Sequence, residues 1–163
     1  MENDKKEIKI TPQELRAMSI FYSATGRPAR DCVIDQENNR IIFLVNPEDV
    51  ALAIGKAGAN VKRAASMLGK SVEVVEYSPF FEGLTKNVLA PVRVVSVRQE
   101  GDKVVIRVRD EDRGLAIGSG GRTANKLKLI LNRYFGVKDV SIKRKIRLAF
   151  GSSVVRLGAG GGI

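Results

Sequence analysis

The sequence contains no histidine, no tryptophan and a single cysteine among its 163 residues. Structural zinc sites and iron–sulfur clusters need several Cys or His ligands, so we expect neither kind of metal site. The absence of histidine excludes a Ser-His-Asp triad and a histidine general base. One cysteine cannot form a disulfide within the chain, which fits a reducing compartment. Cys32 stands in an apolar strand pattern, and we interpret it as a small core residue.

Long apolar runs are also missing from the sequence. No stretch approaches the roughly 18 apolar residues that indicate a membrane-spanning helix. The first residues, Met1 to Lys6, are mostly charged and lack the apolar segment of a signal peptide. We therefore expect a cytoplasmic protein without a membrane span.

Acidic residues are scarce relative to basic ones. Lys and Arg number 28 against 18 Asp and Glu, which gives a net charge of +10. Such a charge favours an anionic partner, with nucleic acid first and a membrane surface second. Taken alone, the charge is explained about equally well if the protein is simply basic and soluble and has no anionic partner. Hydrophobic residues make up 44% of the chain, enough to bury a core.

One short stretch of the sequence occurs twice. Leu52–Gly58 and Leu115–Gly121 both read L-A-I-G-x-x-G, and they lie 63 residues apart (118 − 55). The similarity extends backwards, because Arg40–Asp49 aligns with Lys103–Asp112 at the same spacing. This period is longer than that of solenoid repeats, so the duplication predicts two small domains in tandem.

Each copy has the same order of predicted elements: a helix, two strands, a helix, the glycine turn, a helix and a strand. Thr11-Pro12-Gln13-Glu14 forms a capping box that opens the first copy, and Ser78-Pro79 opens the second. These elements predict an α+β fold in which three helices pack on one face of a three-stranded sheet in each copy. The predicted divisions are a lead-in over 1–10, domains over 11–77 and 78–144, and a tail over 145–163 that is rich in Gly at its end.

The paired glycines between two helices have a chemical use. Glycine lets the backbone turn sharply and lets another backbone approach closely. The free N–H groups and the dipole at the start of the following helix favour an anion. A single turn of this kind is better explained as a corner between helices. Two copies in matching context, in a basic chain, favour binding of a sugar–phosphate backbone.

The glycine motifs resemble the signature of the KH domain, which is an apolar residue, G-x-x-G, two further residues and another apolar residue. It is present here as Ile54–Val61 and as Ile117–Ala124. The element order is similar to that of the prokaryotic type II version. Two abutting copies, separated only by Tyr77-Ser78-Pro79 and without further domains, resemble the NusA family in its archaeal form. The resemblance covers about residues 10–144 and implies two tandem type II KH domains.

The resemblance also implies a function. A KH domain clamps about four nucleotides of single-stranded RNA at its glycine loop, and a NusA-like protein would be a non-catalytic factor of transcription termination or antitermination. Single-stranded RNA and RNA polymerase are the implied partners; no cofactor, small-molecule substrate, catalytic residue or metal ligand is implied. Carried over by position, the RNA-binding residues are Ile54, Gly55, Lys56, Ala57, Gly58, Val61, Lys62 and Arg63 in the first copy, and Ile117, Gly118, Ser119, Gly120, Gly121, Arg122, Ala124 and Lys126 in the second.

Plainer interpretations compete for these residues. The apolar positions are also candidates for core packing, which explains Val61 and Ala124 at least as well. Any one of Lys62, Arg63, Arg122 and Lys126 can be a solvated helix charge. The second loop has Ser119 and Gly120 at its centre and so lacks a basic side chain, which predicts a weaker electrostatic contribution from that loop.

Two other function classes fit parts of the sequence. A protein-interaction module would dock on RNA polymerase or the ribosome, with Leu148–Phe150 of the tail in the contact. Gly69-Lys70-Ser71 resembles the end of a nucleotide-binding loop, but Ala64 replaces the first glycine and the segment leads into a predicted strand. The acidic pairs Glu48–Asp49 and Glu111–Asp112 begin predicted helices, so helix capping explains them better than catalysis.

Overall fold

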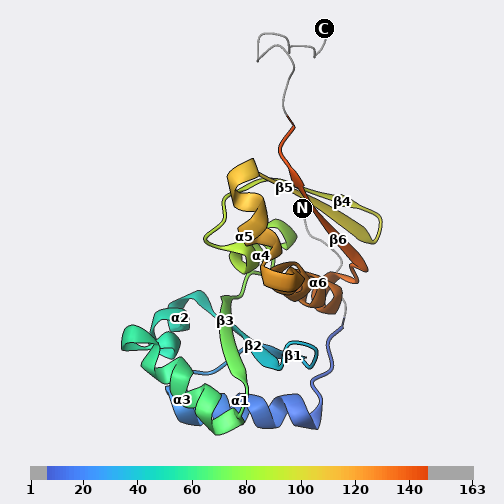
Figure 1. The fold of residues 1–163 in the computed structure, drawn as a ribbon. Helices are drawn as coiled ribbons and strands as arrows, with labels where there is room; N and C mark the ends of the chain where they lie inside the picture. Colours follow the sequence, from blue (N-terminus) through green and yellow to red (C-terminus); the bar gives the residue numbers. More distant parts are fainter. Residues whose placement is uncertain (1–6, 147–163) are drawn as a thin grey trace, which may run out of the picture.

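The structure, a computed structural model, describes residues 7–146 and forms two units of the same topology (Figure 1). The first unit contains α1 (Pro12–Thr25), β1 (Asp31–Asp35), β2 (Arg40–Val45), α2 (Pro47–Ile54), α3 (Ala59–Leu68) and β3 (Ser71–Glu76). The second contains α4 (Phe81–Leu89), β4 (Val94–Glu100), β5 (Lys103–Val108), α5 (Arg113–Ile117), α6 (Arg122–Phe135) and β6 (Asp139–Arg144). Single 3-10 turns, η1 (Lys56–Gly58), η2 (Asp110–Asp112) and η3 (Ser119–Gly121), flank the short helices. The α+β class is confirmed, and Leu148–Phe150 lie outside the described residues.

The two sheets have the same strand order and the same mixed pairing. The first is ordered β1-β2-β3 and the second β4-β5-β6. In each sheet the hairpin partners are antiparallel, and the last strand joins parallel to the middle one. A parallel neighbour needs a crossover connection, which the two helices around the glycine turn provide.

The ends of the helices test the capping predictions. The capping box at Thr11 is confirmed, since its Oγ1 accepts the N–H of Glu14 at 3.1 Å and Glu14 Oε1 accepts the N–H of Thr11 at 3.0 Å. The later acidic residues do lie at helix starts, Glu48 and Asp49 in the first turn of α2 and Glu111 and Asp112 in η2, but no side-chain cap hydrogen bond forms there. Asp49 instead pairs with Arg27 at 3.4 Å, and Asp112 pairs with Arg109 at 2.7 Å.

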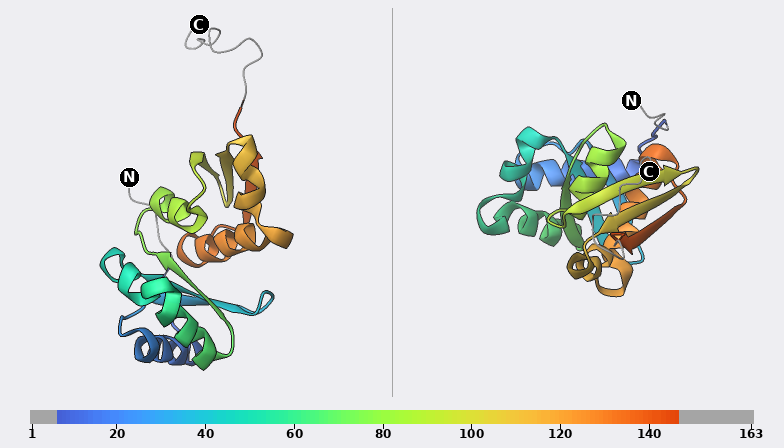
Figure 2. Two further views of the ribbon diagram at one scale, coloured as in Figure 1. Left: turned by 60° about the vertical axis from the view of Figure 1, so that its left-hand side comes forward. Right: turned by 90° about the horizontal axis from the view of Figure 1, so that it is seen from above.

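The first sheet is covered on both faces, not on one. Its own α1 and α3 cover one face, where the rings of Phe21 and Phe43 stack with centroids 4.2 Å apart. Ile42 and Leu44 point to the other face and share a buried cluster with Leu127 of α6. Helix α6 therefore lies between the two sheets, as Figures 1 and 2 show. The expectation of one covered face accounts only for the helices of the same unit.

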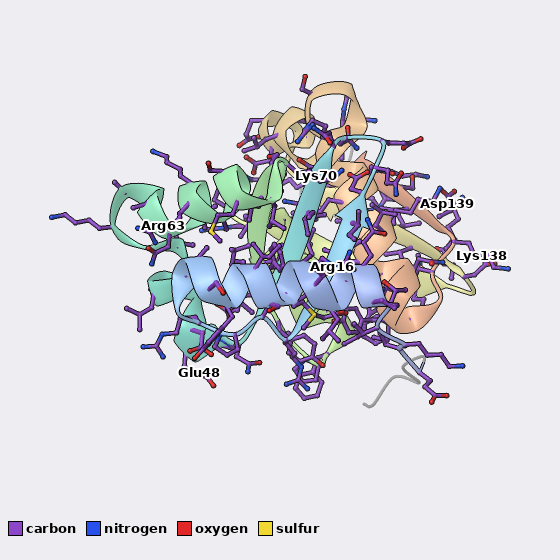
Figure 3. All side chains as sticks on the ribbon, turned by 90° about the horizontal axis from the view of Figure 1, so that it is seen from below. Arg16, Glu48, Arg63, Lys70, Lys138 and Asp139 are labelled. Atoms are coloured by element: carbon purple, nitrogen blue, oxygen red, sulfur yellow. The ribbon has the colours of Figure 1, made fainter. Side chains whose placement is uncertain are left out.

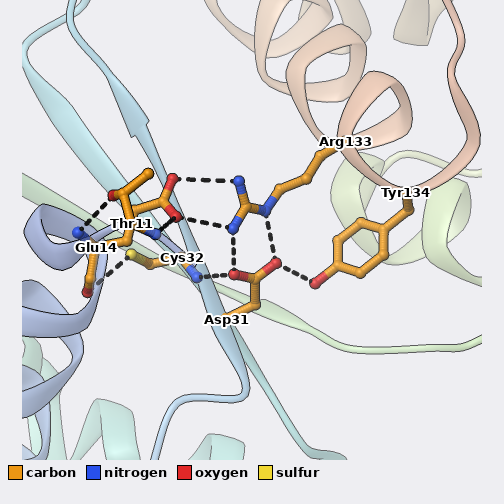
Figure 4. Close-up of polar contacts among 6 residues, drawn as sticks. All are labelled: Thr11, Glu14, Asp31, Cys32, Arg133 and Tyr134. Carbon is orange, nitrogen blue, oxygen red and sulfur yellow. Dashed lines mark hydrogen bonds and ion pairs between the residues drawn. The ribbon is translucent and has the colours of Figure 1, made fainter. Parts of the chain in front are cut away.

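A polar seam borders this apolar contact on one side. Arg133 of α6 donates from Nε and Nη2 to the Asp31 carboxylate, both at 2.7 Å, and also pairs with Glu14 (Figure 4). The Tyr134 hydroxyl donates to Asp31 at 2.5 Å. The hydrogen bond from Arg133 to Asp31 is the main reason that the pKa of Arg133 is raised, while burial and the bond to Asp31 raise the pKa of Tyr134. Asp31 thus joins the first sheet to α6.

A second seam lies around Arg40, whose side chain is 2% exposed. Arg40 donates to Asp35 at 2.7 Å, to Glu73 at 3.0 Å and to the Arg122 carbonyl at 2.6 Å. Within residues 7–146, every buried side-chain nitrogen and oxygen has a hydrogen-bond partner. An interface satisfied in this way holds the two units in one arrangement.

Cys32 is buried in the sheet, as the sequence predicts for a core residue. Burial, with the negative charges of Glu14 and Asp31, raises the pKa of its thiol to about 12. At neutral pH the thiol stays protonated, and its reactivity is correspondingly low.

Candidate nucleic-acid interface

The two glycine loops have nearly the same backbone. Each follows a short helix and ends at the glycine that directly precedes a longer one. In each loop the amide of the last glycine donates to the carbonyl of the first at 3.0 Å. The φ/ψ pairs are 79°/170°, 54°/27° and 74°/17° at Gly55, Ala57 and Gly58, and 82°/164°, 62°/20° and 80°/14° at Gly118, Gly120 and Gly121. The sequence repeat is therefore a repeat of conformation as well.

The first glycine of each loop cannot carry a side chain. A Cβ on Gly55 would lie 2.8 Å from the Asn60 side chain, and one on Gly118 would lie 2.7 Å from the backbone nitrogen of Thr123. Gly120, in contrast, has no atom within 4 Å of an added Cβ. Ala57 occupies the corresponding position in the first loop, so a side chain fits there.

We expect Gly118→Ala to destabilise the second unit by about 3 kcal/mol, because its backbone region is almost closed to other residues and the added methyl meets backbone. Gly120→Ala should cost about 1 kcal/mol, since only the left-handed backbone is unfavourable. Urea unfolding followed by circular dichroism measures both. Equal losses in the two variants would mean that the loop relaxes around the new methyl group.

The cations expected beside the RNA are not equivalent in the structure. Lys56 and Lys62 are exposed, with no hydrogen bond or ion pair to another described residue. Arg63 donates to the Ala24 carbonyl at 2.7 Å and to Asn60, so it ties α3 to the end of α1. Its place on the first unit is seen from below in Figure 3. Lys56 and Lys62 are thus the cations of the first loop that are free to meet a ligand.

The cations at the second loop face the first unit. Lys126 lies 2.8 Å from Glu73 and is only 15% exposed, while Arg122 lies 3.6 Å from the same carboxylate and is 40% exposed. Burial alone would raise the pKa of Glu73, but hydrogen bonds and charges from Lys126 and Arg40 outweigh it and lower that pKa. Lys126 therefore belongs to the contact between the units, and Arg122 keeps one side open to solvent.

The apolar candidates divide in the same way. Ile54 is exposed, whereas Val61 is half-buried and packs on the core of the first unit. Ile117 and Ala124 are half-buried against the other cluster. Val61, Ile117 and Ala124 are thus partly used in core packing, as the plainer interpretation predicted. Ile54 is the apolar candidate whose side chain is exposed to solvent.

A groove of about 380 Å³ adjoins the second loop. Its lining comes from the loop, the first turns of α6, the start of β6 and the β1–β2 turn of the first unit. The lining residues are Glu37, Asn38, Gly120, Gly121, Ala124, Asn125, Lys128, Asp139 and Val140. Both units therefore build the walls of this groove.

Sequence reasoning missed several of these residues. Lys128 supplies an exposed cation one turn beyond Ala124, a position that helical spacing alone could have indicated. Glu37 and Asn38 come from the other unit, and no local pattern points to them. Leu52 and Leu115 are exposed at corresponding positions of α2 and α5. Both belong to the repeated L-A-I-G-x-x-G motif, so the repeat could have indicated them.

Other kinds of site find little support in the described part of the chain. No group of three or more His, Cys, Asp or Glu side chains is placed to hold a metal ion among residues 7–146. None of the helices in that range combines the length and the apolar character needed to cross a bilayer. Gly69 ends α3 and Ser71 begins β3, so the segment lacks the following helix that a nucleotide-binding loop requires.

Comparison with known proteins shows which family the chain resembles. The profile described as KH domain matches residues 16–92, which include the whole of the first unit after the start of α1. A protein of Methanococcus vannielii named "Probable transcription termination protein NusA" is 33% identical over 144 residues, covering 86% of this chain and 82% of its own. The chain belongs to the NusA family.

Further members of the NusA family show the same extent of similarity. Proteins of the same name from Methanocaldococcus jannaschii and Halobacterium salinarum are each 31% identical, covering 83% of this chain and 75% and 98% of their own. Among solved structures, the crystal structure of APE1850 is 44% identical with a TM-score of 0.76, covering 82% of this chain and 99% of that one.

Proposed function

We propose that this chain is a non-catalytic factor of transcription termination or antitermination that holds single-stranded RNA across its two glycine loops. On this proposal residues 11–77 and 78–144 are two tandem type II KH domains, between a lead-in over 1–10 and a tail over 145–163. The observation that carries it is the shared backbone of the two loops, including a left-handed residue at the centre of each. Membership of the NusA family supports the same function, and RNA polymerase is the second partner.

Each loop offers a phosphate the start of a long helix, where the helix dipole favours an anion and the glycines let another backbone approach. The amides of Ala59 and Arg122, the first residues of α3 and α6, donate to the Lys56 and Ser119 carbonyls, so the dipole and nearby side chains carry the proposed contact. Lys56 adds a charge at the first loop. At the second loop, Ser119 adds a hydroxyl, and the nearest open cations are Arg122 and Lys128. Bases would then lie against Ile54 in the first unit and beside Ile117 and Ala124 in the second.

The contact between the units supports one extended RNA site. Arg40 and Lys126 connect the first sheet to the helix that starts at the second loop, so the spacing of the loops does not depend on a flexible linker. Two sites held in this way act together on a strand long enough to reach both, without the loss of effective concentration that a linker brings.

Affinity for unstructured RNA is expected to rise with length until about eight nucleotides, two KH sites of about four each, and then to rise more slowly. Fluorescence anisotropy with labelled strands of increasing length measures this at one fixed salt concentration, since affinity for a polyanion depends on salt. Affinity that depends only on the total charge of the strand, with no step near eight nucleotides, would contradict two defined sites.

In the competing role, at least one KH unit docks on RNA polymerase or the ribosome, and Leu148–Phe150 are part of the contact. Because these residues lie outside the part of the chain that the structure describes, that role stays a prediction.

A further inference from the structure

The outer face of the second sheet differs in chemistry from the corresponding face of the first. Strand pairing makes the comparison direct, because β2 and β5 begin at Arg40 and Lys103 and run in the same register. In the first sheet Ile42 lies opposite Val33. In the second, the residues at these two places are Val105 and Arg98.

The parallel strand pairs, β2–β3 and β5–β6, show the same replacement of apolar residues by basic ones. Leu44 of β2 lies opposite Val75 of β3, and the corresponding residues of β5 and β6 are Arg107 and Lys143. Three apolar side chains are thus replaced by cations around one apolar position that is kept, Val105. We call Arg98, Arg107 and Lys143 the cationic face.

The two faces also differ in what covers them. Val33, Ile42, Leu44 and Val75 are buried under helices of the second unit. No described element covers the cationic face, where Arg98 and Lys143 are exposed and Arg107 is half-buried. A cavity of about 270 Å³ opens there, with Arg98, Val105, Arg107 and Ile146 in its lining. The second sheet therefore keeps an open surface where the first packs a helix.

The cations on this face are not neutralised by nearby acids. Within residues 7–146, the side chains of Arg98 and Lys143 have no hydrogen bond or ion pair, and the side chain of Arg107 donates only to the Arg144 carbonyl, at 2.9 Å. Glu100 lines the same cavity as Arg98 and Arg107 but forms no ion pair with either side chain within residues 7–146. Asp139 lies on the same face, opposite Lys103. Arg40, Lys126 and Arg133, which join the two units, are in contrast each paired with a carboxylate. The cationic face therefore keeps a positive potential available to a ligand.

We propose that the cationic face binds the sugar–phosphate backbone of RNA at a place separate from the glycine loops. β6 is the edge strand that joins the two places, since Asp139 and Val140 line the groove at the second loop and Lys143 lies further along the same strand. RNA that leaves the groove can pass over this edge onto the open face. This extends the proposed function, and depends on it only for the part of the strand that occupies the loops.

Other occupants fit the face less well. A packed protein helix needs a broad apolar centre. Beside these cations the open cavity offers Val105, which is only 9% exposed, and Ile146 at its rim. A second copy would bring the same positive charge. Residues 147–163 contain two arginines and no acidic residue, so they do not complement the face either. A polyanion with regularly spaced charges does.

The test compares two variants with equal loss of charge. One carries Arg98→Gln, Arg107→Gln and Lys143→Gln. The control carries Lys9→Gln in the lead-in and Arg16→Gln and Lys70→Gln on the first unit, where Figure 3 labels Arg16 and Lys70. Against a strand of about 20 nucleotides, the first variant should lose about tenfold in affinity, and the slope of log K against log salt should fall by about 2, or ~0.7 for each of three phosphate contacts. Against a strand of about eight nucleotides, which the loops occupy fully, both variants should behave alike.

The outcomes separate the alternatives. Equal losses in the two variants would show diffuse charge and overturn the proposal. Unchanged RNA binding with lost binding to poly-glutamate would assign the face to an acidic protein and overturn it as well. If aspartates in the glycine loops leave RNA binding intact while the cationic-face variant weakens it, the inference stands and the proposed loop function fails. Should the triple variant not fold, Arg98→Gln with Lys143→Gln, both exposed and unpaired, gives the same comparison.

Discussion

A chain that carries Lys56→Asp, Ala57→Asp, Ser119→Asp and Gly120→Asp is expected to lose at least ~100-fold in affinity for a strand of twelve or so nucleotides. The new carboxylates stand where the proposed phosphates lie. A like charge at about 4 Å costs ~1–4 kcal/mol near a protein surface, and the two loops add their effects. Asp tolerates the left-handed backbone of Ala57 and Gly120 better than most residues do. Fluorescence anisotropy at constant salt measures the loss.

A matched control separates the loops from net charge. Arg16→Asp, Ser66→Asp and Lys70→Asp together lower the net charge by the same amount, away from both loops. This control should lose only a few-fold through the long-range field, which salt screens within about 10 Å. Each loop pair alone should give an intermediate loss, larger for the first pair because it also removes Lys56. A control as weak in binding as the loop variant would make the loops plain corners between helices.

Replacing Arg40 with methionine should destabilise the fold by about 3–5 kcal/mol, the usual cost of leaving a buried charge without its partner. Methionine keeps most of the side-chain volume of arginine but leaves the carboxylate of Asp35, whose side chain is 2% exposed, without its charged partner. It also removes a bond to Glu73 and the bond to the Arg122 carbonyl, which joins the units. Urea unfolding measured by circular dichroism gives the loss, and two separate transitions would show that the units come apart.

The loss should depend on pH in a defined direction. Burial alone would raise the pKa of Asp35, but hydrogen bonds from Asn38 and Arg40 outweigh it and hold that pKa below its ordinary value. A carboxyl with a lowered pKa in the folded state stabilises above its unfolded value of about 3.9, and this contribution disappears as the pH falls through the folded value. The difference between wild type and variant should therefore be largest near neutral pH and shrink below about pH 4.

A second substitution checks the cause. Adding Asp35→Asn to Arg40→Met removes the stranded charge and should recover part of the lost stability. A loss below about 1 kcal/mol in Arg40→Met alone would mean that Asn38, which also donates to Asp35 at 2.9 Å, satisfies the carboxylate by itself.

Local patterns predicted the elements well where a short-range signal is strong. An unbroken apolar run predicts a strand over Arg40–Val45, and a glycine at each end predicts a helix over Ala59–Leu68. These are the bounds of β2 and α3 in the structure. The residue pattern also predicts a strand over Val92–Arg98, but the structure has this strand, β4, at Val94–Glu100. Its ends depend on pairing with β5 across the turn at Gly101, which residue preferences alone do not specify.

The candidate site also has a part that the sequence predicts and a part that it does not. The glycine loops were predictable because their conformation is local and the sequence repeats it. The availability of the cations was not, because their partners come from distant residues. Arg63 meets the Ala24 carbonyl, 39 residues away, and Lys126 meets Glu73, 53 residues away. A helix position alone does not distinguish a free cation from a paired one.

The sequence by itself determined that this protein has two copies of one α+β unit, each with a glycine turn before a long helix, since apolar period, glycines and spacing are all properties of nearby residues. Only the tertiary structure decided how the copies differ. Helix α6 buries the second face of the first sheet, so that face keeps Val33, Leu44 and Val75, whereas the corresponding face of the second sheet is open and carries Arg98, Arg107 and Lys143. The physical reason is that burial and register depend on which surfaces meet, and contacts between residues far apart in the chain set both.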